Sequence, residues 1–304
     1  MFQTAALIRT KMKKFYAEYD EFLRPVLRFL LAFAVLTIYK LYLPVEGSYS
    51  GYAVIAVLSL ICAFLPVGTV SAVSAIFIIL GIYKESLSIT LVLCVYLMVV
   101  AALFLGLRPG KTIILSLVPI CFILKIPYAV PLILALSAGL SGMIPMLSGV
   151  GAWYILDYYH NNAATLQYGT DPMVIVHEFV DITNAIVDSR SIFIVSAAFV
   201  AGMIVTLLIS KISIDHCRTI AIVIGALITD IVYVAGHSFF AVPFDTASLL
   251  IGSVIGTGIA LLYNAFVFNV DFRGKEFLTI EDDDYIYYVK AIPKIRESGK
   301  EERK

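Results

Sequence analysis

The sequence predicts an all-α fold: a polytopic transmembrane bundle of about eight to ten helical segments, some short or re-entrant, with a small C-terminal β-hairpin. Composition supports this prediction, because hydrophobic residues make up 61% of the chain and charged residues only 14%, against about 25% in an average soluble domain. Residue order supports it too, because apolar stretches follow one another from residue 25 to residue 269 with only short interruptions.

Residues 1–24 precede the first apolar stretch and predict an amphipathic helix on the cytoplasmic side of a membrane. Apolar and aromatic side chains gather on one side of such a helix and lysines on the other, which suits an interface with anionic headgroups. The transmembrane domain is then expected over 25–269, and its first crossing over 26–43, before Pro44.

The apolar stretch at 51–83 is too long for one ordinary crossing and is interrupted by Pro66 and Gly68. Proline and glycine are the strongest breakers of a helical pattern. Two short segments are therefore expected, at 51–65 and 69–83.

Two further segments, 87–107 and 112–124, precede a second interrupted stretch at 128–156. Its glycines and Pro145 predict two short segments that meet near residues 143–145. Each interrupted stretch can be a pair of short crossings or a re-entrant hairpin.

The polar stretch at 157–190 carries five acidic side chains and a single basic one, at its end. Inside it, Asp171 as N-cap and Pro172 in the first helical position predict a helix over 172–187. We expect this loop and helix outside the cytoplasm, on the membrane surface or packed over the bundle. Three cleaner spans are expected after it, at 191–210, 219–236 and 246–268.

Basic residues set the predicted orientation, because cytoplasmic loops of membrane proteins are enriched in Lys and Arg. Ten crossings with a cytoplasmic N-terminus place the basic residues of 108–111 and 211–218 in the cytoplasm, together with the C-terminal tail. The acidic stretch 157–190 then lies outside. The prediction is a multi-pass protein of the plasma membrane with both termini cytoplasmic.

The tail, residues 270–304, differs in character from the transmembrane domain. Residues 277–280 and 285–289 are aromatic and β-branched, and the acidic run 281–284 lies between them. This alternation predicts a small cytoplasmic β-hairpin with an acidic turn.

Asp230 is the candidate site residue inside the membrane, about two-thirds along the span 219–236. A charged side chain at the bilayer centre costs at least about 2.5–3.5 kcal/mol, so such residues usually face a bundle interior or a cavity. A proton, cation or substrate site is one interpretation. The other is a structural carboxylate that is hydrated or bonded to a hydroxyl such as that of Thr229 or Tyr233.

The two interrupted stretches are the second candidate for a substrate or ion pathway. Many transporters bind substrate where discontinuous helices meet at mid-membrane, and Pro66, Gly68 and Ser71 could form such a site with Pro145 and Ser148. The alternative is that both are turns between short, tilted helices.

No catalytic constellation, metal site or cofactor motif is expected, and the chain is predicted not to be an enzyme. His177-Glu178 is followed by Asp181 where a zinc-protease helix needs a second histidine. Residues 108–112 end in Gly-Lys-Thr but lack the upstream glycine of a phosphate-binding loop. No basic face suited to nucleic acid is visible, so the expected partner is the lipid bilayer.

Several strings of this chain resemble an uncharacterised family of bacterial multi-pass membrane proteins, sometimes labelled ABC-transporter permeases. They are residues 125–131, 213–215, 268–271, 281–285 and 287–294. The resemblance implies a membrane topology and ranks transport first. We therefore expect a transporter or permease-like component. The alternative is a non-catalytic subunit or scaffold of a membrane complex, which docks a cytoplasmic partner through its N-terminal helix and tail.

Overall fold

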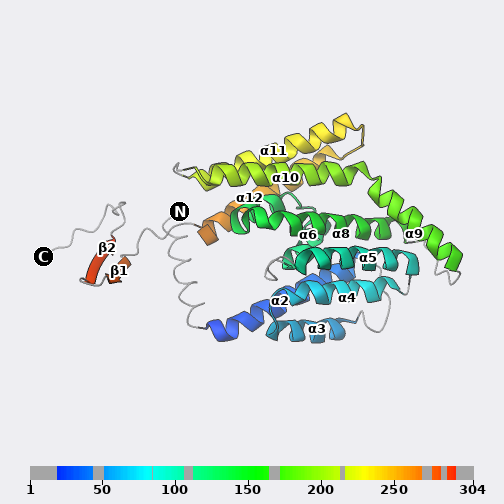
Figure 1. Cartoon of the computed structure of the whole chain (residues 1–304), viewed down its shortest axis with the longest axis horizontal. Coiled ribbons are helices and arrows are strands. Elements are labelled where there is room, and N and C mark those ends of the chain that lie inside the picture. Colours follow the sequence, from blue (N-terminus) through cyan, green and yellow to red (C-terminus); the bar gives the residue numbers. More distant parts are fainter. Residues whose placement is uncertain are drawn as a thin grey trace.

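The computed structural model describes residues 19–43, 51–83, 85–105, 112–163, 172–212, 216–268, 276–281 and 286–291. Up to residue 268 the described chain is helical, so the predicted all-α bundle is confirmed there (Figure 1). The α-helices are α2 (Asp20–Tyr42), α3 (Tyr52–Phe64), α4 (Thr69–Tyr83), α5 (Leu87–Leu105), α6 (Ile113–Ile123), α7 (Ala129–Ser137), α8 (Met143–Asn162), α9 (Pro172–Val187), α10 (Arg190–Ser210), α11 (Cys217–Phe239) and α12 (Thr246–Tyr263). A 3-10 helix, η3 (Gly139–Gly142), precedes α8, and a π-helix, η4 (Asn264–Phe268), continues α12.

Within the described residues, five helices are long and apolar enough to cross a membrane. They are Phe22–Tyr42, Gly139–Asn162, Arg190–Ser210, Cys217–Phe239 and Thr246–Val267. Shorter apolar helices accompany them, at Tyr52–Phe64, Thr69–Tyr83, Leu87–Leu103 and Ile113–Ile123. These helices indicate a membrane location.

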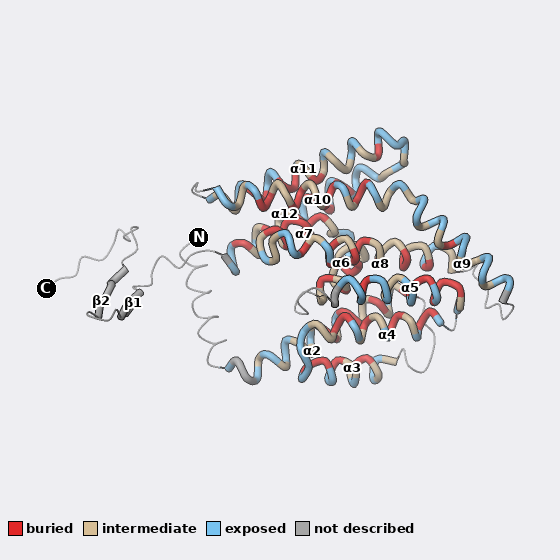
Figure 2. The backbone as a smooth tube through the Cα atoms, viewed as in Figure 1, coloured by how far each residue is buried: buried red, intermediate tan, exposed pale blue. Residues whose placement is uncertain are grey.

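The outer faces of the helices are apolar, as a lipid environment requires. On α12, Leu250 is 61% exposed and Val254 71%, and on α11 Leu227 is 56% exposed. Figure 2 shows such exposed stretches along the outside of α10 and α11, with buried stretches on the faces toward neighbouring helices. Large apolar side chains on so much of the surface are rare in soluble monomers.

Helices α6 and α7 are too short to cross a bilayer individually. Their 11 and 9 residues extend about 16 and 14 Å, against a hydrocarbon thickness of about 30 Å. Helix α5 runs toward the end of the bundle where α2 begins, and α8 starts from that end (Figure 1). The chain between α5 and α8 therefore leaves and returns to one end. Helices α6 and α7 are joined by residues 124–128, which we call the α6–α7 connection.

The interruption at Pro66 and Gly68 is confirmed, because α3 ends at Phe64 and α4 starts at Thr69. The helix predicted at 172–187 is also confirmed as α9. It packs on α5 and α8, where Ser88 donates a 2.6 Å hydrogen bond to Glu178.

The predicted break near residues 143–145 was wrong in position. Helix α7 ends at Ser137, and the chain turns at Gly139, whose φ is +60°, a conformation that glycine adopts without steric cost. Pro145 instead lies in the first turn of α8, where backbone N–H groups have no partner inside the helix and a proline removes no hydrogen bond.

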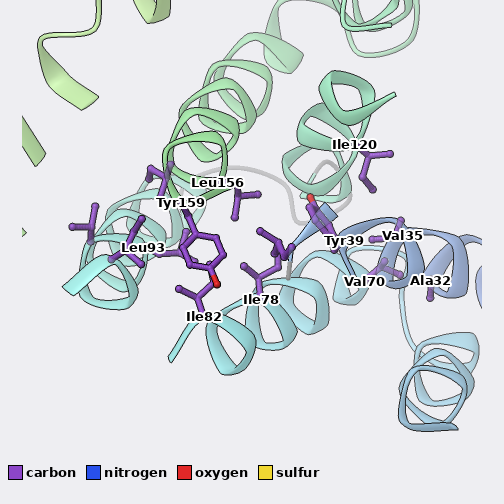
Figure 3. Close-up of a cluster of buried hydrophobic side chains, with 14 of the residues drawn as sticks. Ala32, Val35, Tyr39, Val70, Ile78, Ile82, Leu93, Ile120, Leu156 and Tyr159 are labelled. Atoms are coloured by element: carbon purple, nitrogen blue, oxygen red, sulfur yellow. The ribbon is translucent and has the colours of Figure 1, made fainter. Parts of the chain in front are cut away.

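The larger buried cluster in the N-terminal part joins α2, α4, α5, α6 and α8. Figure 3 shows Tyr39, Ile78 and Leu156 facing one another across three of these helices. Tyr39 is 1% exposed, and its hydroxyl donates a 2.8 Å hydrogen bond to the Ser116 carbonyl oxygen. The cluster is otherwise mainly aliphatic.

Helices α10 and α11 pack more closely than side chains larger than glycine allow. A Cβ atom at Gly202 would lie 1.9 Å from Thr229 Oγ1, and one at Gly225 would lie 1.9 Å from Thr206 Oγ1. Each threonine donates to the carbonyl oxygen four residues earlier on its own helix, at 2.7 and 2.8 Å. The two helices therefore present matching glycine–threonine faces, the small-residue packing typical of membrane helices.

The two ends of the bundle differ in the way that the charge pattern predicts. Helix α2 begins, α10 ends and α11 begins at one end, whereas α8 ends and α10 begins near α9 at the other (Figure 1). The basic residues Lys211 and Arg218 therefore lie at the end opposite the acidic helix α9. Which end faces the cytoplasm stays a prediction.

The predictions for the N-terminal helix and for the C-terminal tail fall only partly within the described residues. Helix α2 already begins at Asp20, so the expected boundary after residue 24 falls inside a helix, and residues 1–18 lie outside the described part. In the tail, β1 (Glu276–Glu281) and β2 (Ile286–Ala291) are antiparallel, with Glu276 opposite Ala291. The hairpin with its acidic turn, its cytoplasmic position and its docking role stay predictions.

Candidate functional site

The described part of the chain contains a cavity of about 340 Å³ where the α6–α7 connection meets α8, α10, α11 and α12. This volume falls within the range of small-molecule sites, about 300–1,000 Å³. Because Asp157 near the end of α8 and Ser191 at the start of α10 line it, the cavity lies toward the end of the bundle near α9. The lining residues are Phe122, Lys125, Pro127, Tyr128, Trp153, Tyr154, Asp157, Ser191, Val195, Phe199, Tyr233, His237, Pro243, Phe244 and Ser248.

The α6–α7 connection presents Lys125 to this cavity from a strained backbone. Lys125 has a φ of +59°. Its N–H donates to the Phe122 carbonyl oxygen, and the N–H of Ile126 donates to that of Cys121, each at 2.9 Å. This pattern closes a helix C-terminus and usually places glycine where Lys125 stands. A side chain there costs about 1–2 kcal/mol, so the lysine is present despite its backbone.

Helix α12 supports the connection from behind. A Cβ atom at Gly252 would lie 2.9 Å from the Lys125 carbonyl oxygen, and one at Gly256 would lie 2.8 Å from the Ala129 backbone nitrogen. These glycines are four residues apart and share one face of α12. The connection therefore rests directly on a helix surface, which holds Lys125 and Tyr128 in place.

Aromatic rings form much of the cavity wall. Phe122 stacks on Trp153 with ring centroids 5.3 Å apart. Tyr233 meets Tyr128 and Phe244 edge to face, each at 6.0 Å. The faces of such rings attract cations and apolar groups alike.

The two charged residues of the lining, Asp157 and Lys125, do not pair with each other. Asp157 accepts hydrogen bonds from the Tyr42 hydroxyl and the Asn161 side-chain amide, both at 3.2 Å. Within the described residues, neither Asp157 nor Lys125 contacts a side chain of formal opposite charge. A carboxylate and an ammonium group thus border one largely aromatic space without neutralising each other.

His237 adds a buried acceptor to the lining. The side chain is 4% exposed, and its Nδ1 lies 3.2 Å from the Val242 carbonyl oxygen. A carbonyl oxygen only accepts, so Nδ1 carries the proton, and in the neutral ring Nε2 is left with a lone pair. Nε2 is buried and has no hydrogen-bond partner among the described residues.

Asp230 does not line the cavity, but it lies one helical turn from Tyr233 on α11. Ser253 of α12 donates a 2.5 Å hydrogen bond to its Oδ2, while Oδ1 is buried without a partner among the described residues. The hydroxyl partner comes from the neighbouring helix rather than from Thr229 or Tyr233. A role for Asp230 in a pathway stays a prediction.

Pro66 and Gly68 lie in the turn between α3 and α4, where Pro66 is exposed. Ser71, at the start of α4, donates a 2.8 Å hydrogen bond to the Gly68 carbonyl oxygen. Ser71 also lines a second cavity of about 30 Å³, close to the hydroxyl pair of Ser74 and Ser116 at 2.7 Å. This cavity has room for about two water molecules.

Pro145 and Ser148 lie in the first two turns of α8 and line neither of these cavities. Ser148 donates to the Ile144 carbonyl oxygen at 2.9 Å, and its own carbonyl oxygen accepts from the Tyr96 hydroxyl. Residues of both interrupted stretches line the smaller cavity, Ser71 and Ile78 from one and Ala152 and Leu156 from the other, but the break residues Pro145 and Ser148 do not. Their role in a pathway stays a prediction.

Sequence reasoning did not select Lys125, Asp157, Tyr128, Tyr233 or His237 as site residues. In the sequence, Lys125 marks the end of a predicted segment. Asp157 is one of several acidic residues in the polar stretch, and His237 is a lone histidine. A usable signal was the repeated occurrence of aromatic residues near the same predicted end of the spans at 128–156 and 219–236. Only the packing of α8 against α10 and α7 brings those ends together.

The described residues contain no group of three or more His, Cys, Asp or Glu side chains that could hold a metal ion. No family model, no curated protein and no solved structure matches the chain.

Proposed function

We propose that the protein is a permease-like transporter, and that the 340 Å³ cavity binds its substrate. The observation that carries this proposal is the position of the cavity. It lies at the junction of two short, discontinuous helices, α6 and α7, inside a bundle of apolar spans. In many transporters such junctions form the substrate site, because the interrupted backbone supplies polar groups at membrane depth.

The arrangement of the wall supports transport rather than chemistry. The cavity combines aromatic faces with a few convergent polar groups, which suits reversible recognition of a small organic molecule. No bond is made or broken in this proposal, and the lipid bilayer is the medium in which the protein acts. The predicted membrane is the plasma membrane.

The test is uptake into proteoliposomes that contain only this chain. Vesicles are incubated with a uniformly ¹³C-labelled mixture of small metabolites, washed and analysed by mass spectrometry. Ser248 lines the cavity and is exposed, so Ser248→Trp should fill the cavity and abolish uptake, whereas Ser248→Ala should leave uptake within about twofold, as for a surface substitution.

Labelled compound inside wild-type vesicles, but not in Ser248→Trp vesicles, supports the proposal. Absence of uptake by folded wild-type protein contradicts it. In that case the alternative, a non-catalytic subunit of a membrane complex, becomes the better explanation.

A further inference from the structure

We infer that the cavity is selective for small zwitterions that carry an ammonium group, a carboxylate and an apolar body, as free amino acids do. This inference deepens the proposed function and rests on the same cavity. Lys125 and Asp157 carry it, because both belong to the lining, carry opposite charges and do not touch each other.

Lys125 is exposed and Asp157 is half-buried, so a ligand in the cavity can reach both charges. Asp157 accepts from the Tyr42 hydroxyl and the Asn161 amide, both at 3.2 Å, and lies near His160, while Lys125 has no acidic side chain in contact among the described residues. A ligand with one charge would satisfy one of these groups. A zwitterion satisfies both at once and adds no net charge to the site.

The backbone at Lys125 fixes where its side chain starts. This residue stands in the left-handed conformation that the end of a helix normally gives to glycine. His216 and Ala241 also adopt a positive φ, so the conformation alone assigns no role. The side chain brings to the cavity a cation that the carboxylate of a ligand can bind.

The remaining groups define the rest of the ligand. Trp153 and Tyr233 bring aromatic surface to the lining, which suits an apolar or aromatic side chain, and rings beside a carboxylate also favour an ammonium group. The ring of His237 belongs to the lining, but its Nε2 is buried and does not face the open space of the cavity. The ligand class is therefore an amino acid with an apolar or aromatic side chain.

Three probes separate the charges, because they share a phenyl body. They are L-phenylalanine, 2-phenylethylamine, which keeps only the ammonium group, and 3-phenylpropanoate, which keeps only the carboxylate. Binding to the purified full-length chain is measured by thermal shift and calorimetry. L-phenylalanine should bind at least about tenfold more tightly than either singly charged probe, the gain expected for one charge-assisted hydrogen bond.

Two variants should separate the same two contacts. Lys125→Met should weaken L-phenylalanine about tenfold and leave 2-phenylethylamine within about twofold. Asp157→Asn should weaken L-phenylalanine similarly and leave 3-phenylpropanoate nearly unchanged. Lys211→Met and Asp188→Asn are matched controls, since both residues are exposed and neither lines the cavity.

Equal affinity for the three probes, or equal losses in the matched controls, would show an apolar cavity without charge selection and would overturn the inference. No binding of any probe by folded protein would overturn it too. Either result leaves proteoliposome uptake of another compound as independent support for transport. Conversely, selective zwitterion binding without uptake would uphold the inference and contradict the transporter.

Discussion

The N-terminal helices α2–α5 and the C-terminal helices α10–α12 solve the same packing problem in different ways. The first group closes around an aliphatic cluster and leaves a cavity of only about 30 Å³. The second group packs through glycine–threonine faces and, with α6–α8, leaves a cavity of about 340 Å³. The closest backbone contacts, between α10 and α11, thus occur in the same region as the larger cavity.

The two regions also differ in how their polar groups are satisfied. In the N-terminal region Ser59 and Thr90 donate to carbonyl oxygens of their own segments, both at 2.7 Å. Three hydroxyls of that side of the bundle have no partner among the described residues, those of Thr37, Ser86 and Tyr159. In the C-terminal region the unpartnered atoms belong to ionisable side chains, Asp230 and His237. Ionisable groups inside a membrane domain are usually functional. Under the proposed function, the substrate site therefore lies on the side of the C-terminal region.

The largest expected effect concerns orientation, which both regions should share. Single cysteines are placed at Tyr19 and Glu85 in the first region and at Ile212 and Asp188 in the second, after replacement of the four native cysteines. An impermeant thiol reagent should label positions 85 and 188 in intact cells, and positions 19 and 212 only after permeabilisation. Labelling of 19 with 188, or of 85 with 212, would mean that the two regions do not share one orientation.

The next effect tests the glycine–threonine packing that distinguishes α10–α11. Gly202→Leu should destabilise the protein by about 3 kcal/mol, because its side chain would overlap Thr229 and force the helices apart. Gly258→Leu is the matched control, since a Cβ atom there meets nothing within 4 Å. Thermal unfolding in detergent, with size-exclusion profiles, gives the comparison. Equal stability of the two variants would refute close packing of these helices.

A smaller effect tests whether Asp230 depends on its neighbour on α12. Ser253→Ala should cost about 1–3 kcal/mol, because it removes the hydrogen bond to Oδ2 and leaves a half-buried carboxyl group without that donor. In an Asp230→Leu background the same change should cost almost nothing. Chemical unfolding of the four proteins measures the coupling. An identical cost in both backgrounds would separate Ser253 from Asp230.

The smallest effect distinguishes the contribution of the Lys125 backbone conformation to stability from that of its side chain to binding. Lys125→Gly should be more stable than Lys125→Ala by about 1 kcal/mol, because only glycine adopts the observed φ of +59° without strain. Both variants lose the ammonium group, so both should lose zwitterion binding to the same extent. Thermal unfolding and calorimetry provide the two readouts. A less stable glycine variant would contradict the strained conformation.

Much of the helical order could be predicted from the sequence. The interruption at Pro66 and Gly68 and the helix that Pro172 starts follow from local rules, since these residues restrict the backbone wherever they stand. The break expected near Pro145 fell instead at Gly139, because proline is tolerated in a first helical turn and the sequence does not show where that turn begins. Boundaries depend on packing more than on local preference.

Most of the candidate site, unlike the helical order, could not be predicted from the sequence. Asp230 was found from the sequence, since a carboxylate in an apolar run is conspicuous by itself, but its partner Ser253 was not. Lys125, Asp157 and His237 were each visible and each unremarkable alone. Their relation depends on contacts between helices far apart in the chain, and a single sequence contains no record of such contacts.

The sequence by itself determined that the chain is apolar enough for a membrane, where its helices run and where they break, because hydrophobicity and backbone restriction are properties of individual residues and short stretches. The tertiary structure decided which helices meet, which polar atoms find partners and where space remains. Those outcomes depend on how the glycine faces of α10, α11 and α12 allow the helices to approach. The cavity, and the presence of both Lys125 and Asp157 in its lining, therefore exist only in the folded bundle.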